Sequence, residues 1–201
     1  MGERLNIEIV KNGDVLANCY YHWSGFSECA INLTTKIIQE MDYIKNSSRL
    51  MKSEVKNKDI LFAIRLLEST GAGVPERERE EVREMLGNID LPLNKCIGRN
   101  EGLIGVTEKA IAETENWQEE SVTIDIEKKT IDFRAVEDIS EKELFEEYEI
   151  PEDEIGKENI NFKEIKFEDV FNLKARIELA NYKGQQYFYN EFDKQYYYWI
   201  G

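Results

Sequence analysis

The sequence has little of what a metal centre, a disulfide framework or a membrane anchor requires. Its 201 residues include one histidine, three cysteines and three prolines. Cys19, Cys29 and Cys96 are odd in number and follow no ligand spacing, which is typical of reduced thiols and predicts neither a metal site nor a cofactor. No apolar run approaches the ~20 residues of a membrane helix, and the N-terminus lacks the pattern of a signal peptide. We therefore expect a cytoplasmic protein, of a bacterium or of an infected host cell.

Established catalytic and phosphate-binding motifs are also missing. The segment Ser69–Gly73 is rich in glycine, but it follows a helical pattern and lacks the Gly-Lys-Ser/Thr ending of a phosphate loop. It is predicted to stop a helix. No dinucleotide fingerprint, zinc spacing or calcium loop is present. The sequence therefore favours a binding protein over an enzyme.

Negative charge is what the chain has in excess. It carries 41 acidic and 26 basic residues, a formal net charge of −15. Residues 137–169 hold 14 of the acids and 4 of the bases, and thus about two thirds of the net charge. Phosphate backbones are bound through lysine and arginine, so general nucleic-acid binding is excluded. A basic protein partner, or solubility alone, is compatible with such a charge.

Three segments alternate apolar and polar residues around turn signals and predict β-hairpins. The first turns at Asn12-Gly13, the strongest short hairpin signal; the second covers 121–136; the third covers 186–200 and is dense in aromatic residues. The two-residue loop of the first hairpin predicts these cross-strand pairs: Lys11–Asp14, Ile9–Val15, Ile7–Ala17 and Leu5–Cys19.

Apolar residues at helical spacing, with capping residues before them, predict the helices between the hairpins. The predicted helices span about 27–45, 57–69, 75–86, 107–117, 140–148 and 167–179. The fold class is therefore α+β, with a mostly antiparallel sheet built from hairpins and helices packed on it. This element order is compatible with a layered αββα arrangement. We expect one domain over residues 1–201, in which 137–166 form an acidic, partly irregular insertion.

The polar face of the first hairpin is the leading candidate site. It carries His22, the one histidine of the chain, and a helix N-terminus follows whose free N–H groups favour anions. A ligand with a phosphate and an aromatic base suits this mixture, with Tyr20 or Trp23 stacked on the base. The alternative interpretation is a solvated hairpin face followed by ordinary helix capping. The predicted ligand-binding residues are Asn18, Tyr20, His22, Trp23, Ser24 and Ser27.

Two catalytic alternatives remain open. His22 is a candidate base for Ser24 or Ser27, with Glu8 as the orienting acid of a serine mechanism. Asp125 and Asp132 are predicted to face each other across the second hairpin, and paired carboxylates serve acid–base chemistry. The alternative for this pair is simple screening by solvent and by the lysines of the turn.

Two resemblances add expectations. The element order resembles that of amino-terminal-nucleophile hydrolases, whose signature is a Cys, Ser or Thr exposed as the first residue after processing; here Gly2 follows Met1. The short, acidic, Lys/Glu/Ile/Asn-rich chain is similar to accessory proteins of phages that infect Gram-positive bacteria. That resemblance implies an anti-defence role in immune evasion, such as a sponge for cyclic nucleotides or ADP-ribose-type signals, or an acidic inhibitor or DNA mimic.

Three functional hypotheses follow. The first is a non-enzymatic protein that sequesters a small nucleotide-derived ligand. The second is an acidic inhibitor that uses residues 137–169 to cover a basic partner such as a host enzyme. The third is a hydrolase that uses His22 or the Asp125/Asp132 pair. The aromatic hairpin at 186–200 is interpreted as part of the sheet core. The alternative is a homodimer contact, because aromatic side chains are favoured at interfaces.

Overall fold

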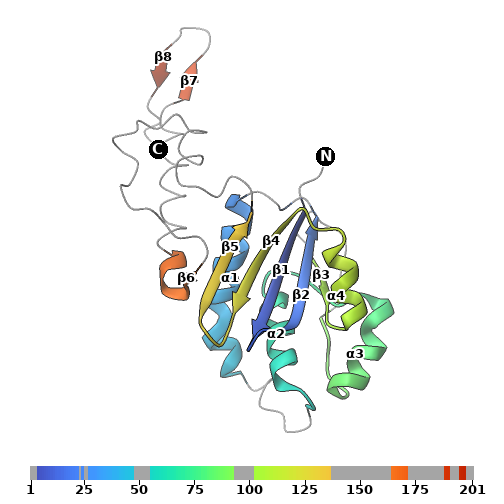
Figure 1. The fold of residues 1–201 in the computed structure, drawn as a ribbon. Coiled ribbons are helices and arrows are strands. Elements are labelled where there is room, and N and C mark those ends of the chain that lie inside the picture. Colours follow the sequence, from blue (N-terminus) through green and yellow to red (C-terminus); the bar gives the residue numbers. More distant parts are fainter. Residues whose placement is uncertain are drawn as a thin grey trace.

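The computed structural model describes residues 4–22, 24, 27–47, 55–92, 102–136, 164–171, 188–190 and 195–197. Its centre is a six-stranded mixed sheet in the order β3-β2-β1-β4-β5-β6 (Figure 1). All neighbouring strands are antiparallel except β1 and β4, which are parallel. The predicted α+β class with a mostly antiparallel sheet is confirmed. The strands are β1 Arg4–Lys11, β2 Asp14–His22, β3 Leu103–Gly105, β4 Glu120–Asp125, β5 Thr130–Ala135 and β6 Ile165–Lys166.

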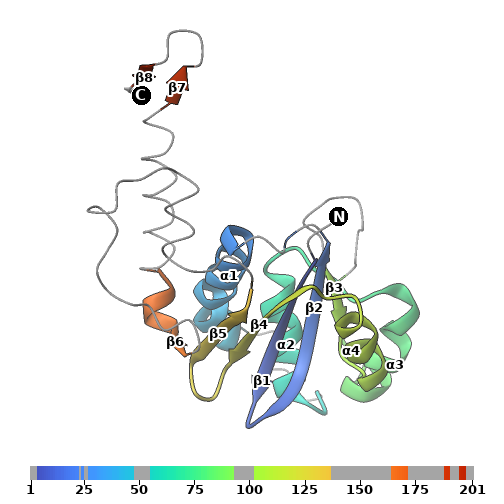
Figure 2. The same cartoon turned by 45° about the horizontal axis from the view of Figure 1, so that its top comes forward.

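Helices cover both faces of this sheet (Figures 1 and 2). Helices α1 and α2 pack together on one face, and α4 lies on the other face over β2 and β3. A layered αββα arrangement needs two stacked sheets, whereas the described residues place a single six-stranded sheet between helices. The helices are α1 Ser27–Lys45, α2 Lys58–Glu68, η1 Glu76–Glu78, α3 Arg79–Leu86 and α4 Glu108–Glu115.

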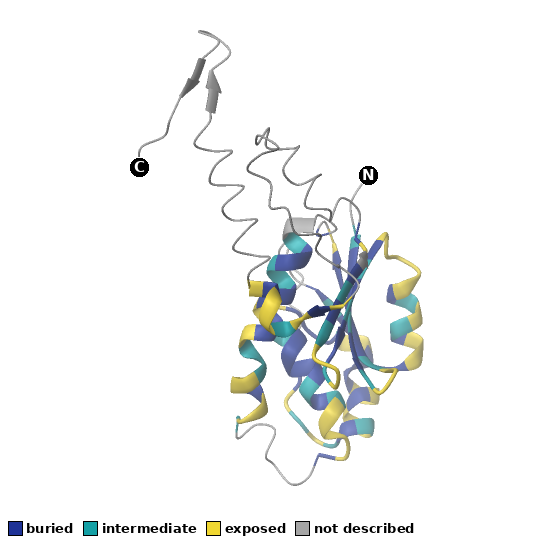
Figure 3. Ribbon diagram, turned by 60° about the vertical axis from the view of Figure 1, so that its left-hand side comes forward, coloured by how far each residue is buried: buried dark blue, intermediate teal, exposed yellow. Residues whose placement is uncertain are grey.

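The hydrophobic core lies between the sheet and the α1/α2 layer. Figure 3 shows the buried residues gathered along the strands and on the sheet-facing sides of these helices. Each fully buried Leu, Ile or Phe side chain contributes roughly 1.5–3 kcal/mol. The Tyr21 hydroxyl is buried as well and lies 2.8 Å from the Thr70 hydroxyl, just after α2. The apolar face of the first hairpin is fully buried at Leu5, Ile7, Ile9, Ala17, Cys19 and Tyr21.

The register of the first hairpin differs from the prediction by two residues beyond the turn. Lys11 pairs with Asp14 as expected, but Ile9 pairs with Ala17 and not with Val15, Ile7 with Cys19, and Leu5 with Tyr21. An irregularity between Ile9 and Val10 leaves Leu16 as an extra residue on β2, which moves the pairing by one residue. The other residue of the difference comes from the predicted pairs themselves, because a regular antiparallel ladder from Lys11–Asp14 places Ile9 opposite Leu16 and not Val15. A shift of two residues keeps every side chain on its predicted face.

The predicted helix boundaries are confirmed where local capping fixes them. Asn57 caps α2 by accepting the Ile60 N–H at 3.2 Å, and Thr107 caps α4 by accepting the Ala110 N–H at 3.2 Å. Gly71 ends the α2 region with a φ of +98°, which confirms that the glycine-rich segment is a helix stop. Among the described helices, none is long and apolar enough to cross a membrane.

Some predictions fall largely outside the described residues. The helix expected over 140–148 lies there entirely. Of the acidic, partly irregular insertion expected over 137–166 only residues 164–166 are described, and Ile165 and Lys166 form β6, an edge strand of the sheet. The helix expected over 167–179 is described only as far as Phe171. The third hairpin is confirmed in its backbone pairing by β7 (Phe188–Asn190) and β8 (Gln195–Tyr197), and the rest of it lies outside the described residues.

Candidate functional site

The polar faces of the first two hairpins form one continuous surface of the sheet. Because β1 and β4 are parallel neighbours, Glu8 pairs with Asn18 on one side and with Thr123 on the other. Thr123 in turn pairs with Asp132 on β5. A row of polar side chains therefore crosses four strands, which neither hairpin could show alone.

Helix α4 covers the β2 end of this row. Asn18 is fully buried, and its side-chain amide donates to the Thr114 hydroxyl at 2.7 Å and to the Ile111 carbonyl at 3.3 Å. Close approach is possible because Gly105 has no side chain: a Cβ there would lie 2.6 Å from Asn18 Oδ1. The interpretation of this face as a solvated surface is therefore wrong at Asn18, whose amide anchors α4 to the sheet.

Towards the start of β1 the row becomes aromatic and basic. The Tyr20 ring meets the edge of Trp117, with centroids 5.6 Å apart and an interplanar angle of 73°. The Tyr20 hydroxyl lies 3.0 Å from His22 Nδ1, and His22 pairs with Arg4 across the strands. Burial raises the pKa of Tyr20, the nearby Arg4 guanidinium opposes this, and the Glu119 carboxylate adds to it.

Two neighbouring side chains hold buried polar atoms without partners. Asn6 is fully buried between Tyr20 and Ser121, and within the described part of the chain neither atom of its amide group has a hydrogen-bond partner. The same holds for the buried Nε of Arg4. Leaving such a group unpaired costs about 1–3 kcal/mol, so an unpaired group in a folded protein calls for an explanation such as a ligand, ion or water. We refer to Arg4, Asn6, Tyr20, His22 and Trp117 as the Arg4–Asn6 patch.

Of the other predicted ligand-binding residues after β2, the structure describes Ser24 and the backbone of Ser27. Ser24 is 3% exposed, and α1 begins at Ser27 as expected. Trp23 and the side chain of Ser27 lie outside the described residues, so stacking on Trp23 stays a prediction. Sequence reasoning missed Arg4 and Trp117. Trp117 lies in the connection from α4 to β4, and this connection meets Tyr20 only because of the order of the strands in the sheet.

Glu8 sits in a different part of the row and does not orient His22. It lies four residues from Arg4, the cross-strand partner of His22, and hence about 13 Å along the strand. Burial raises the pKa of Glu8 and the Glu115 carboxylate raises it further, while the Thr123 hydroxyl, 3.4 Å away, lowers it. The predicted serine mechanism with Glu8 as its acid is therefore wrong.

The two aspartates of the second hairpin do not face each other. Asp125 pairs with Thr130, and Asp132 pairs with Thr123. Asp125 Oδ1 accepts the backbone N–H groups of Glu127 and Lys128 at 3.0 and 2.9 Å, so this carboxylate shapes the turn. The predicted pairing of Asp125 with Asp132 is wrong, because it requires a shorter turn than the four residues, Ile126 to Lys129, that the structure shows.

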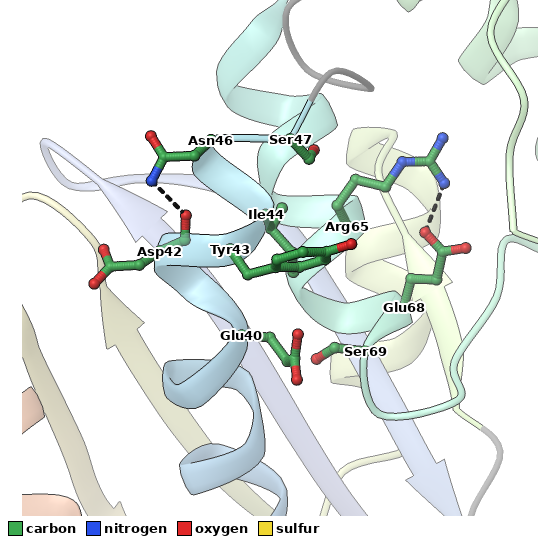
Figure 4. A pocket seen from close by; sticks show the side chains of 9 residues that line it. All are labelled: Glu40, Asp42, Tyr43, Ile44, Asn46, Ser47, Arg65, Glu68 and Ser69. Atoms are coloured by element: carbon green, nitrogen blue, oxygen red, sulfur yellow. Dashed lines mark hydrogen bonds and ion pairs between the residues drawn. The ribbon is translucent and has the colours of Figure 1, made fainter.

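Two cavities lie away from the Arg4–Asn6 patch. One, of about 720 Å³, lies between the end of α1 and α2 (Figure 4). Tyr43, which is 75% exposed, lines this cavity, and the ion pair of Arg65 with Glu68 at 2.6 Å forms part of its wall. The second cavity, of about 690 Å³, lies between α1, the β4–β5 turn and β6.

The described residues contain no group of three or more His, Cys, Asp or Glu side chains that could hold a metal ion. No family model matches the chain, and neither a curated protein nor a solved structure matches it.

Proposed function

We propose that the protein is a non-enzymatic binding protein that holds a small nucleotide-derived ligand at the Arg4–Asn6 patch. The observation that carries this proposal is the fully buried amide of Asn6, whose donor and acceptor are both unpaired beside the unpaired Nε of Arg4. An asparagine amide can bond the edge of adenine with donor and acceptor together. A guanidinium matches the oxygens of a phosphate.

The patch has the spacing of a mononucleotide. Asn6 and Arg4 are two residues apart on one face of β1, about 7 Å along the strand, which is comparable to the separation between a base and its phosphate. The base would contact Tyr20 and Trp117, since aromatic rings stack on bases. The phosphate would lie at Arg4 and His22, which pair across the strands, and the guanidinium can bond its oxygens.

Binding without turnover is supported by the arrangement of the titratable groups. Glu8 is too far from His22 to orient it, and Asp125 is engaged with the turn. A protein that only holds its ligand can act as a sponge for a nucleotide signal, which is the anti-defence role that the sequence resemblance implied. The inhibitor hypothesis depends on residues 137–169, of which only 164–169 are described, so no structural observation favours it.

The proposal is tested by ligand capture. Purified protein is incubated with a nucleotide-rich extract, washed and denatured, and the released molecules are identified by mass spectrometry. We expect a stoichiometric, chemically intact nucleotide from the native protein and none from Asn6→Leu or from His22→Ala combined with Tyr20→Ala. Tyr43→Ala, at an exposed aromatic residue in the first cavity, is the matched control and should retain the ligand. An altered nucleotide, or equal capture by the patch variants, would refute the proposal.

A further inference from the structure

The second cavity combines positive charge with an apolar floor. Three lysines line it: Lys128 and Lys129 in the β4–β5 turn and Lys166 in β6. In a chain with a net charge of −15, the three lysines outnumber the two carboxylates of the same lining, which gives the cavity a formal charge of +1. Asp42 and Glu168 are the carboxylates that line the same cavity.

All three lysines are exposed. Lys128 is 73% exposed and its Nζ lies 3.4 Å from Asp125 Oδ2, a surface contact worth little. Within the described residues, neither Lys129 nor Lys166 forms an ion pair. Their backbone is nevertheless fixed, because Lys166 pairs with Thr130 and the Lys129 carbonyl accepts the Phe167 N–H at 3.1 Å.

The floor of the cavity is made by four apolar side chains: Ile38 and Met41 of α1, with Phe167 and Phe171 beyond β6. Ile38 is 9% exposed and packs in the core, whereas Phe171 is 37% exposed, one of few large apolar side chains of the described residues that reach the surface. A volume of about 690 Å³ lies within the range of sites that hold small organic ligands. Covering Phe171 with an apolar group would remove its surface from water.

We propose that this cavity binds a single amphipathic anion, with a carboxylate or phosphate head at the three lysines and an aliphatic chain along the apolar floor. The lysine ammonium groups neutralise the head, and Met41 adapts to the chain because its side chain is flexible. The site is separate from the Arg4–Asn6 patch: none of the residues that line it belongs to that patch. It differs in chemistry too, because the patch has a buried amide to read a base and this floor has four apolar side chains.

The test uses dodecanoate and dodecyl phosphate as probes, below their micelle concentrations, with isothermal titration calorimetry on the full chain. We expect saturable binding of both at one site per chain, and no binding of dodecyltrimethylammonium, whose head has the opposite charge. Lys129→Gln combined with Lys166→Gln should weaken binding at least tenfold. Lys58→Gln combined with Lys109→Gln removes the same charge from exposed positions elsewhere and should leave binding unchanged.

Three results would overturn the proposal: equal binding by the two double variants, equal binding of the cationic amphiphile, or sedimentation with phosphatidylglycerol vesicles in the absence of binding to monomeric probes. The last result would assign the lysines to a lipid surface. Adenosine monophosphate is titrated in parallel, to separate this proposal from the proposed function. Asn6→Leu should not change dodecanoate binding, and the Lys129/Lys166 variant should not change nucleotide binding, so each proposal can fail alone.

Discussion

Replacing Asn6 with leucine should make the protein more stable while it removes the ligand. Asn6 is fully buried, and both polar atoms of its side chain lack partners in the described part of the chain. An unsatisfied buried group costs about 1–3 kcal/mol, and an apolar side chain of similar size does not incur that cost. We therefore expect Asn6→Leu to raise the free energy of unfolding by about 1–3 kcal/mol.

The assay is urea unfolding of the purified chain. The dependence of the unfolding free energy on urea concentration is compared between variants, because a shift in midpoint reports stability when this slope is unchanged. For a chain of this size each kcal/mol corresponds to about 2–4 °C in Tm. Asn18→Leu is the matched control, because the Asn18 side chain is equally buried and its Oδ1 also lacks a partner in the described residues, but its Nδ2 donates to Thr114 at 2.7 Å. Loss of that bond should lower stability by about 1 kcal/mol.

A decrease in stability of more than about 1 kcal/mol in Asn6→Leu would refute the reasoning, because it would show that the amide is hydrogen-bonded within the folded chain. An increase in stability together with unchanged nucleotide capture would instead show that the unpaired amide does not bind the nucleotide. Functional residues commonly reduce stability, and a variant that gains stability while losing binding is the signature of such a residue.

The remaining predictions concern the rest of the polar row. Because the pKa of Glu8 is raised in the folded protein, Glu8 contributes stability that is complete below its unfolded pKa and is lost as pH rises through its folded pKa. The urea midpoint of Glu8→Gln should therefore match that of the native protein at pH 4 and exceed it at pH 7. A difference in urea midpoint that is the same at both pH values would contradict this. Asp125→Ala should lower stability by about 1 kcal/mol, because two turn N–H groups lose their acceptor. Asp125→Asn keeps an acceptor oxygen and should stay within about 0.5 kcal/mol of the native protein. Equal losses in the two variants would argue against the role of Asp125 in the turn. Gly105→Ala should cost about 1–3 kcal/mol because its Cβ would lie 2.6 Å from Asn18 Oδ1. Gly13→Ala, whose Cβ meets open space at a φ of +89°, should show only backbone strain of about 1–2 kcal/mol. The last two are compared by thermal unfolding, and a larger loss at Gly13 would contradict the packing of α4.

Local signals predicted the elements well. Capping residues such as Asn57 and Thr107 set the helix boundaries, because their side chains bond the first free N–H groups and this needs no distant partner. The Asn12-Gly13 turn placed the first hairpin, since both residues adopt positive φ there. The predicted register was wrong by two residues, of which the extra residue Leu16 accounts for one. Alternation of apolar residues could not reveal the error, because it is the same before and after a shift of two.

The candidate site was only half predictable. The sequence placed Tyr20 and His22 on one face of a strand, and the structure keeps them there with the hydroxyl and Nδ1 3.0 Å apart. It could not assign Arg4 or Trp117 to the same place, because they come from the start of β1 and from the connection after α4. The sequence also did not show that Asn6 is buried, because the burial of a strand residue depends on which segments cover that face of the sheet.

The sequence by itself determined the class of the fold, the ends of most described helices, and which side of each strand is apolar, because these depend on interactions within a few residues. Tertiary structure alone decided that β1 and β4 lie side by side, that α4 covers Asn18, and that three lysines from a turn and an edge strand surround one apolar cavity. These features join segments far apart in the chain. They depend on the order of strands in the sheet, and that order follows from the packing of the whole domain, on which no local pattern carries information.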